Sequence, residues 1–303
     1  MAACWQGRGG HGPMHDWVAR QLGSEVVARR PLGGGCIHSA WCLELADGRR
    51  VFAKTNNASA LPLLAAEAEG LAALARWATP PLRLPEPLAL GATGDAAVLL
   101  LSWLELAAAG HRGEAWASLG AALADLHRAS AAGEPGRGYG FGSDNFIGSS
   151  PQPNGWMERW ERFFVERRLT PQLARAAQRG CPFVRSAALL HRAAELLADH
   201  SCSPVLVHGD LWSGNAALLA DGDVAVFDPA VYWGDREVDL AMARLFGGFP
   251  EAFFAGYQNR WPLPADWPQR LELYNLYHLI NHANLFGGGY QRQAQAVIDR
   301  LLR

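Results

Sequence analysis

Two short polar motifs, each directly after an apolar run, constrain the fold of this chain more than any other feature. The first reads HGDLWSGN over residues 208–215 and follows PVLV, and the second reads DPA over residues 228–230 and follows VAVF. Between them, DGD at 221–223 is a signal for a hairpin turn. We therefore expect a small β-ribbon that brings three polar side chains together at its mouth. These are Asp210, Asn215 and Asp228.

This set of side chains suits phosphoryl transfer. Kinases use an Asp to orient the attacking hydroxyl, and an Asn and a second Asp to hold Mg²⁺. The spacing from Asp210 to Asn215 matches the kinase catalytic loop H-R-D-x-x-x-x-N, with Gly209 where kinases carry Arg. Amide and carboxylate oxygens are also the hard donors that Mg²⁺ prefers. The pattern predicts Asp210 as the catalytic residue, Asn215 and Asp228 as metal ligands, and ATP as the phosphoryl donor.

A second pattern, near the start of the chain, is typical of a phosphate-binding loop. Strand-like runs at Val26–Leu32 and 40–45 flank a glycine loop, and after the turn Asp47-Gly48 a third run ends at Lys54. Backbone N–H groups of a glycine loop can approach phosphate oxygens, and a strand Lys can reach the α- and β-phosphates. Three glycines alone are most often turns, but their position two strands ahead of Lys54 favours nucleotide binding. The glycines are Gly33, Gly34 and Gly35.

The next segment, 61–77, reads as an amphipathic helix with a carboxylate in its apolar stripe. Glu67 lies among the leucines of that stripe, whereas Glu69 points towards solvent. A carboxylate on an apolar face is unfavourable unless it is paired. We expect an ion pair with Lys54 of the kind that positions ATP in kinases. The alternative is a surface Glu at the edge of the stripe.

The order of elements predicts an α+β, two-lobed, protein-kinase-like fold, with a β-rich N-lobe and a mainly helical C-lobe. Residues 1–13 are expected to be a disordered extension or to precede a true start at Met14. We expect the N-lobe over 14–101, a hinge over 102–106, and the C-lobe over 107–303. Backbone groups at Ser102 and Leu104 of the hinge would meet the adenine ring. The C-lobe pattern predicts one long loop at 133–155 and five helices. These helices are expected at 114–131, 156–173, 186–200, 239–246 and 271–286, and the first of them shows no unusual polar cluster on its core face.

Composition excludes several function classes. The chain has 303 residues, half of them hydrophobic, and a formal charge of −2, so nothing favours nucleic acid or a membrane surface as partner. The apolar run 96–104 is too short to span a bilayer. Five cysteines without C-x-x-C spacing argue against a disulfide scaffold or a zinc site of that type and favour a reducing cytoplasm.

Longer blocks of the sequence resemble the fructosamine (ketosamine) kinases, within the aminoglycoside and choline kinase-like group. HGDLxxGN alone marks only that broad group, but Trp212 and the flanking blocks narrow the resemblance to the ketosamine kinases. The blocks extend from about the glycine loop to near the C-terminus, and Gly35-Cys36 departs from many bacterial members. They read HGDLWSGN, DPA, GDREVDLA at 234–241, FGSDNFIG at 141–148, RLTPQL at 168–173 and NHANLFGGG at 281–289.

The resemblance implies ATP-dependent phosphorylation of the hydroxyl on the third sugar carbon of a ketosamine, with a role in protein deglycation. Partners would be ketosamine small molecules or glycated protein lysines, and the protein would be a monomer or dimer. Ribulosamine, erythrulosamine and fructosamine adducts are the candidate acceptors. Asp239 would brace the catalytic loop, with His208 holding nearby backbone, and Trp212 and His282 would lie near the sugar.

The same residues also fit other functions and other roles. The acceptor could be another small alcohol, such as an aminoglycoside, choline or homoserine. A non-catalytic pseudokinase would be expected to have lost one of the key residues, and all are present. Trp212 could be a core residue, and His278 with His282 has a helical spacing used for zinc but lacks a third ligand. Cys36, beside the glycines, is a candidate redox-sensitive thiol or a small loop residue.

Overall fold

The computed structural model describes residues 12–33, 37–108, 113–133 and 136–303. The chain divides into two compact units. The first comprises the residues up to Ala75 together with Leu84–Leu106, and the second comprises Arg76–Arg83 and Ala107–Arg303. The sequence patterns place 76–83 in the first lobe. The structure instead pairs β4 (Leu82–Arg83) with β11 (Val224–Val226) of the second unit.

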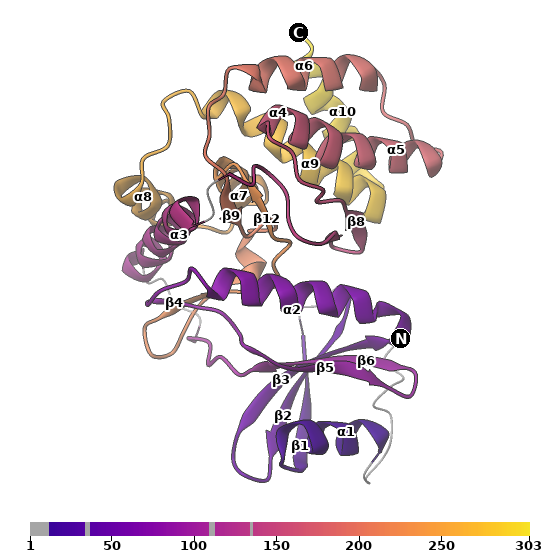
Figure 1. The fold of residues 1–303 in the computed structure, drawn as a ribbon, viewed down its shortest axis with the longest axis vertical. Coiled ribbons are helices and arrows are strands. Elements are labelled where there is room, and N and C mark those ends of the chain that lie inside the picture. The colour runs from indigo at the N-terminus through magenta and orange to yellow at the C-terminus, as the bar shows by residue number, and fades with distance from the viewer. Residues whose placement is uncertain (1–11, 34–36, 109–112, 134–135) are drawn as a thin grey trace. The chain divides into compact units, whose positions relative to one another are not determined.

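The first unit is an antiparallel sheet with the strand order β1-β2-β3-β6-β5 and a helix on each face (Figure 1). The strands are β1 (Val26–Leu32), β2 (Ser39–Leu45), β3 (Arg50–Asn57), β5 (Pro87–Thr93) and β6 (Ala96–Ser102), and the helices are α1 (Pro13–Leu22) and α2 (Leu61–Ala75), the latter preceded by the 3-10 turn η1 (Ala58–Ala60). Successive side chains of a strand point to opposite faces. On β6, Val98 and Leu100 pack with α1, whereas Leu99 and Leu101 pack on the α2 side.

The same alternation decides where Lys54 points. Val51 and Ala53 of β3 belong to the cluster on the α1 face, and Phe52 packs against the cluster on the α2 face. Lys54 therefore faces α2, which carries Glu67. By length and composition, 58–75 is also apolar enough to cross a membrane. Its packing on β5 and β6 identifies α2 as a core helix of this unit.

Within its described residues, the second unit holds three small β-structures around the two polar motifs at 208–215 and 228–230. Strands β10 (Ala216–Leu218) and β11 form the expected hairpin. The run before His208, β9 (Val205–Val207), lies outside that hairpin and pairs antiparallel with β12 (Tyr232–Gly234). The segment predicted to be a long loop also contains a hairpin, formed by β7 (Asn145–Ile147) and β8 (Ser150–Gln152).

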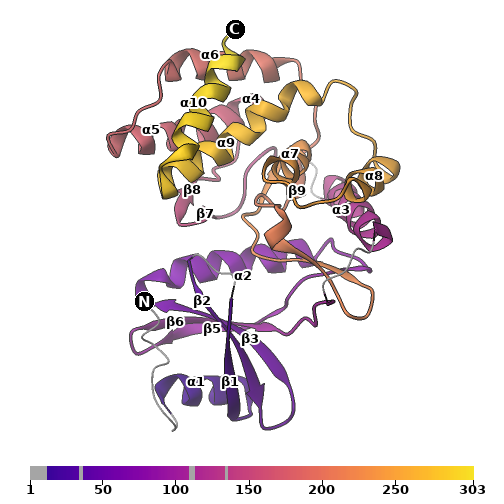
Figure 2. The ribbon, with the colours of Figure 1, turned by 180° about the vertical axis from the view of Figure 1, so that it is seen from behind.

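Helices make up most of the rest of this unit (Figure 2). They are α3 (Gly113–Gly133), α4 (Trp160–Phe163), the π-helical segment η2 (Phe164–Leu169), α5 (Thr170–Gln178), α6 (Ser186–Ala198), the 3-10 turn η3 (Ser213–Asn215), α7 (Glu237–Leu245), α8 (Glu251–Arg260), α9 (Pro268–Phe286) and α10 (Gly289–Leu301). The prediction that 156–159 is helical is wrong, because Met157 pairs with Tyr139 in an isolated β-bridge. The sequence patterns did not predict helices α8 and α10. Helix α8 buries two residues and α10 buries three, so the apolar stripe of each helix is short.

Candidate functional site

Asp210, Asn215 and Asp228 lie together in the second unit. The Asn215 Nδ2 group donates to the Asp210 backbone oxygen at 2.9 Å and to its carboxylate at 3.3 Å. It also reaches the Asp228 backbone oxygen at 3.5 Å. All three of these hydrogen bonds leave from Nδ2, so the Asn215 Oδ1 atom is available as a donor to a metal ion. An amide oxygen beside an exposed carboxylate on Asp228 is a donor set that fits Mg²⁺.

Two backbone features explain why these motifs need their particular residues. Gly209 has φ +79°, and a Cβ there would lie 2.1 Å from the Ala230 oxygen. The catalytic loop therefore passes against the DPA segment, where the Ala230 N–H donates to the His208 oxygen at 2.8 Å. Asp228 itself has φ +58°, a left-handed conformation that non-glycine residues seldom adopt. Backbone strain of this kind is common at functional sites.

Asp239 supports the catalytic loop from α7. Its buried carboxylate accepts the backbone N–H groups of His208 at 2.7 Å and Gly209 at 2.8 Å. His127 of α3 donates to the same carboxylate from Nε2 at 3.1 Å. Burial would raise the pKa of Asp239, but the hydrogen bonds from His127 and the loop hold its pKa below the ordinary value. This carboxylate therefore stays charged.

The imidazole of His208 is held in one orientation and is neutral, so His208 and Asp210 have different roles. Its Nε2–H donates to the Phe227 oxygen at 3.0 Å, and its Nδ1 accepts the Asp210 N–H at 3.3 Å. Burial lowers the pKa of His208. Burial, followed by the nearby charge of Asp228, raises the pKa of Asp210 to about 7. A carboxylate with such a pKa is suited to accept a proton near neutral pH.

In the first unit, Lys54 and Glu67 form a buried ion pair. Nζ lies 2.7 Å from Oε1, and the side chains are 9% and 10% exposed. Glu69 is exposed. Ser102 ends β6, and its N–H and Oγ hydrogen-bond the backbone of Glu86, both at 2.8 Å.

Of the remaining predicted residues of this unit, Leu104 is half-buried and Gly33 directly follows β1 in an exposed position. The predictions for Gly34, Gly35 and Cys36 lie outside the described residues.

The predicted sugar-side residues of the second unit are accessible. Trp212 is 40% exposed, which excludes the core interpretation, and its ring lies over Gly214, where a Cβ would be 2.2 Å from the ring. His282 is half-buried on α9, with the rings of Phe246 and Tyr290 centred 4.7 and 5.1 Å away. Burial lowers the pKa of His282, so its imidazole is neutral. In the described part of the chain, His278 and His282 gain no third metal ligand.

Comparisons with known proteins show the family of this chain. The fructosamine kinase family model covers residues 13–303. A probable ketoamine kinase from Synechocystis sp. is 46% identical over 279 residues, covering 92% of this chain and 91% of that protein. The chain belongs to the fructosamine kinase family. The predicted family is therefore confirmed.

Two further relatives of this fructosamine kinase extend the comparison. The protein-ribulosamine 3-kinase of Arabidopsis thaliana is 35% identical over 96% of this chain and 88% of its own length. The crystal structure of a putative fructosamine-3-kinase from Haemophilus somnus superposes with a TM-score of 0.86 at 28% identity, covering 96% of this chain and 97% of that one. The predicted α+β, protein-kinase-like fold is confirmed, and the protein is an ATP-dependent kinase.

Several residues that hold this kinase site together were missed by the sequence interpretation. His127 and Ser130 are fully buried on α3, so the expectation of no polar cluster on that face is wrong. Both lie in the stripe that also contains Leu119, Leu123 and Leu126, and a polar residue at such a position is the signal that could have found them. Ser130 Oγ accepts the Leu206 N–H of β9 at 3.0 Å.

Another missed group fixes the DPA segment from the β7–β8 hairpin. Gln152 donates to the Ala230 oxygen at 3.1 Å, and Asn145 donates to the Val231 oxygen at 2.7 Å. Behind them, the fully buried Arg168 donates to the Pro153 oxygen and to Asn154, both at 2.7 Å. Its guanidinium lies 3.9 Å from the centre of the Tyr232 ring. These hydrogen bonds and the ring contact hold the hairpin in place beside the DPA segment, although the buried Nε of Arg168 has no hydrogen-bond partner among the described residues.

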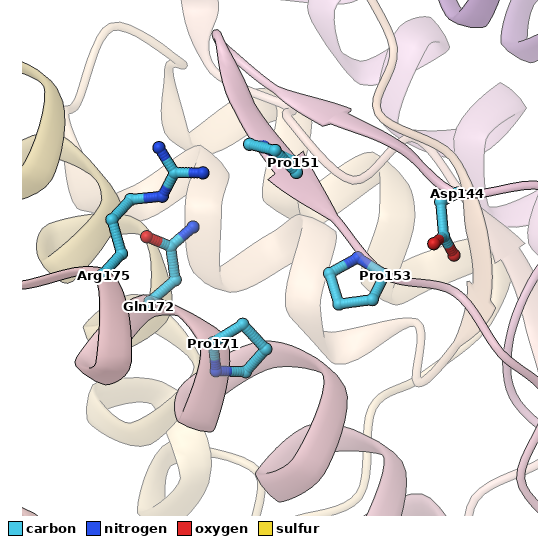
Figure 3. Close-up of a pocket in the computed structure, with 6 residues that line it drawn as sticks. All are labelled: Asp144, Pro151, Pro153, Pro171, Gln172 and Arg175. Carbon is cyan, nitrogen blue, oxygen red and sulfur yellow. The ribbon is translucent and has the colours of Figure 1, made fainter. Parts of the chain in front are cut away.

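A separate cavity of about 210 Å³ lies between the β7–β8 hairpin and α5 (Figure 3). Three prolines form part of its wall, and Asp144 and Arg175 lie towards opposite sides. None of the predicted site residues lines it. Its lining residues are Asp144, Pro151, Pro153, Pro171, Gln172 and Arg175.

Proposed function

We propose that this fructosamine kinase transfers the γ-phosphoryl group of ATP to the hydroxyl on the third sugar carbon of ketosamines. The acceptors are free ketosamines or glycated protein lysines, and the phosphorylated adduct then decomposes and releases the amine. The observation that carries the proposal is the cluster of Asp210, Asn215 and Asp228, joined through Asn215 and supported by Asp239. We place this activity in the reducing cytoplasm.

Asp210 acts as the general base. Its carboxylate accepts the proton of the acceptor hydroxyl and orients the oxygen for attack. Asn215, through Oδ1, and Asp228, through its carboxylate, would hold Mg²⁺, which would neutralise charge on the phosphates. Asp239 and His208 keep the loop in place through the hydrogen bonds described above. His208 is not the base, because both of its ring nitrogens are engaged.

The first unit binds the nucleotide. Lys54, fixed by Glu67, contacts the α- and β-phosphates, and the glycine loop over Gly33–Gly35 supplies backbone N–H groups. The Ser102 backbone oxygen and the backbone of Leu104 meet the adenine, because the Ser102 N–H already donates to the Glu86 oxygen. In the second unit, the exposed ring of Trp212 and the neutral imidazole of His282 contact the sugar.

The proposal is tested by measuring ADP release from the purified protein with defined acceptors. We expect turnover with adducts of lysine with ribulose, erythrulose or fructose, and preference for the ribulose or erythrulose adduct. The name of the Arabidopsis relative supports the ribulose adduct. Kanamycin, choline and homoserine are the control acceptors. Turnover of one of these without turnover of any ketosamine would contradict the proposal and favour a kinase of another small alcohol.

A further inference from the structure

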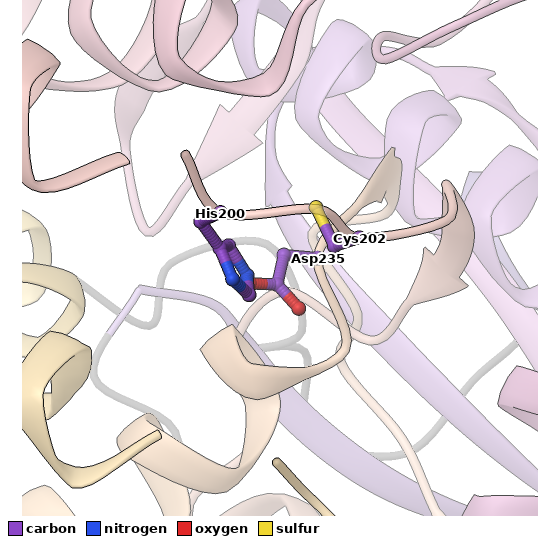
Figure 4. A group of neighbouring side chains, drawn as sticks. All are labelled: His200, Cys202 and Asp235. Carbon is purple, nitrogen blue, oxygen red and sulfur yellow. The ribbon is translucent and has the colours of Figure 1, made fainter. Parts of the chain in front are cut away.

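A second group of potential metal ligands lies in the same unit, at the far end of the β9–β12 pair from His208. His200 and Cys202 lie between α6 and β9, and Asp235 lies between β12 and α7. Antiparallel pairing of Val205 with Gly234 places the start of β9 beside the end of β12. The ligand atoms of all three side chains therefore meet, and they lie within 4.8 Å of one another (Figure 4).

Hydrogen bonds from neighbouring groups already orient these side chains. Asp235 Oδ2 accepts the Tyr274 hydroxyl at 2.6 Å, and Oδ1 accepts the Glu237 N–H at 3.0 Å. The Tyr139 hydroxyl donates to the Cys202 backbone oxygen at 2.6 Å and lies 3.4 Å from its sulfur. Outer groups of this kind fix the ligands of metal sites.

The charge at this cluster is not balanced by a permanent cation. Asp235 is 1% exposed, and its one ion-pair partner in the described part of the chain is His200, at 2.7 Å. Arg270 is already shared between Glu237 and Asp266. Arg236, the next residue in the chain, donates to the backbone oxygens of Trp261 and Pro262. A buried carboxylate of this kind is stabilised by a bound cation.

We propose that His200, Cys202 and Asp235 form a binding site for Zn²⁺. One imidazole nitrogen, one thiolate and one carboxylate oxygen are the donors that Zn²⁺ takes, at bond lengths of about 2.0–2.3 Å. The three ligand atoms already lie within 4.8 Å of one another, and the ion would replace the hydrogen bond between His200 and Asp235. A water would complete four-coordination. Sulfur and nitrogen donors distinguish this site from the all-oxygen set of Asn215 and Asp228, which suits Mg²⁺.

Bound Zn²⁺ would tie together the two segments that support the catalytic loop. Cys202 precedes β9, which leads directly into His208. Asp235 precedes α7, which carries Asp239, the acceptor for the His208 and Gly209 N–H groups. The ion would therefore stabilise the folded chain, as any ligand does that binds only the native state.

The test is calorimetric titration of the full-length, chelator-treated protein with Zn²⁺ in excess Mg²⁺, without any acceptor substrate. We expect a single tight equivalent for the wild type and binding that is weaker by about a hundredfold in His200→Ala and in Cys202→Ala. Cys181→Ser and His191→Gln, which change an exposed thiol and an exposed imidazole, are matched controls and should bind as the wild type does. Zn²⁺ should raise the melting temperature of the wild type and the controls only.

Substitution of Co²⁺ into the wild type decides the question if a variant fails to fold. A thiolate-to-cobalt absorption band with tetrahedral visible transitions supports the site. Absence of that band, absence of a tight equivalent, or Zn²⁺ binding unchanged in both His200→Ala and Cys202→Ala overturns it.

Discussion

The two groups of proposed site residues are held in place in different ways. In the second unit, the catalytic loop is fixed by many hydrogen bonds that converge on Asn215, His208 and Asp239. In the first unit, Lys54 has Glu67 as its ion-pair partner, on the helix that packs over its strand. The loop contacts are mostly between side chains and backbone, whereas the Lys54 contact joins two side chains.

This difference predicts different responses to substitution. Many contacts together position the loop at 208–215, so the loss of one supporting contact should leave most of the loop geometry intact. Only loss of the reacting group, Asp210, should abolish phosphoryl transfer. Where one buried pair positions a cation, losing either partner removes the function of both, because members of one pair act as a unit.

Asp210→Asn should abolish phosphoryl transfer while sparing ATP binding. The amide retains the size of the carboxylate but cannot accept the hydroxyl proton, so turnover should fall by a factor of about a hundred or more. The measurement is steady-state turnover alongside the ATP dissociation constant. Asp221→Asn in the exposed hairpin turn is the matched control and should be silent. Near-normal turnover of the Asp210 variant would remove this residue from the mechanism.

Lys54→Ala and Glu67→Ala should each lower kcat/KM for ATP by about tenfold or more, and the double variant should be little worse than either. Each single change also removes the ion-pair partner that the other buried charge has at 2.7 Å, which should lower the free energy of unfolding by about 3–5 kcal/mol. The double variant should regain part of that loss. Glu44→Ala on exposed β2 surface is the control. Additive kinetic effects would show that the two residues act separately.

Asp239→Asn should give a smaller effect, because the loop keeps its other contacts. In this variant an NH₂ group replaces one carboxylate oxygen of residue 239 and faces hydrogen-bond donors. The lost acceptor should lower the free energy of unfolding by about 1–3 kcal/mol. Turnover should fall by less than in Asp210→Asn. Chemical unfolding and turnover are measured on the same samples, with Asp223→Asn as control. A loss of turnover equal to that of Asp210→Asn would mean that the loop depends on this single contact.

His278 should make the second unit sensitive to acid. Burial and the neighbouring His282 lower the pKa of His278 from 6.5 to about 3, so the unfolded chain takes up this proton first as the pH falls. Stability should therefore decrease below about pH 6.5, by about 2 kcal/mol at pH 5 from this group. His278→Leu should remove that decrease, whereas the exposed His191→Leu should keep it. Identical unfolding profiles of wild type and His278→Leu would exclude His278 as the cause.

The sequence was informative where motifs have fixed local spacing. Strand alternation, helix periodicity and a recognisable turn were enough to predict two groupings of residues. These are the cluster of Asp210, Asn215 and Asp228, and the Lys54–Glu67 pair. The contacts that support them join residues far apart in the chain, such as His127 with Asp239 or Gln152 with Ala230. No local pattern specifies such partners. For the same reason the pairing of β9 with β12, and of β4 with β11, became clear only in the structure.

The most direct test of the account is to determine where the phosphate goes. Wild type and Asp210→Asn are incubated with ATP, Mg²⁺ and the ribulose adduct of lysine, and the products are assigned by phosphorus–proton correlation NMR. The account predicts a phosphate ester on the third sugar carbon with the wild type and no ester with Asp210→Asn. An ester on another carbon, or the same ester formed at comparable rate by the variant, would contradict it.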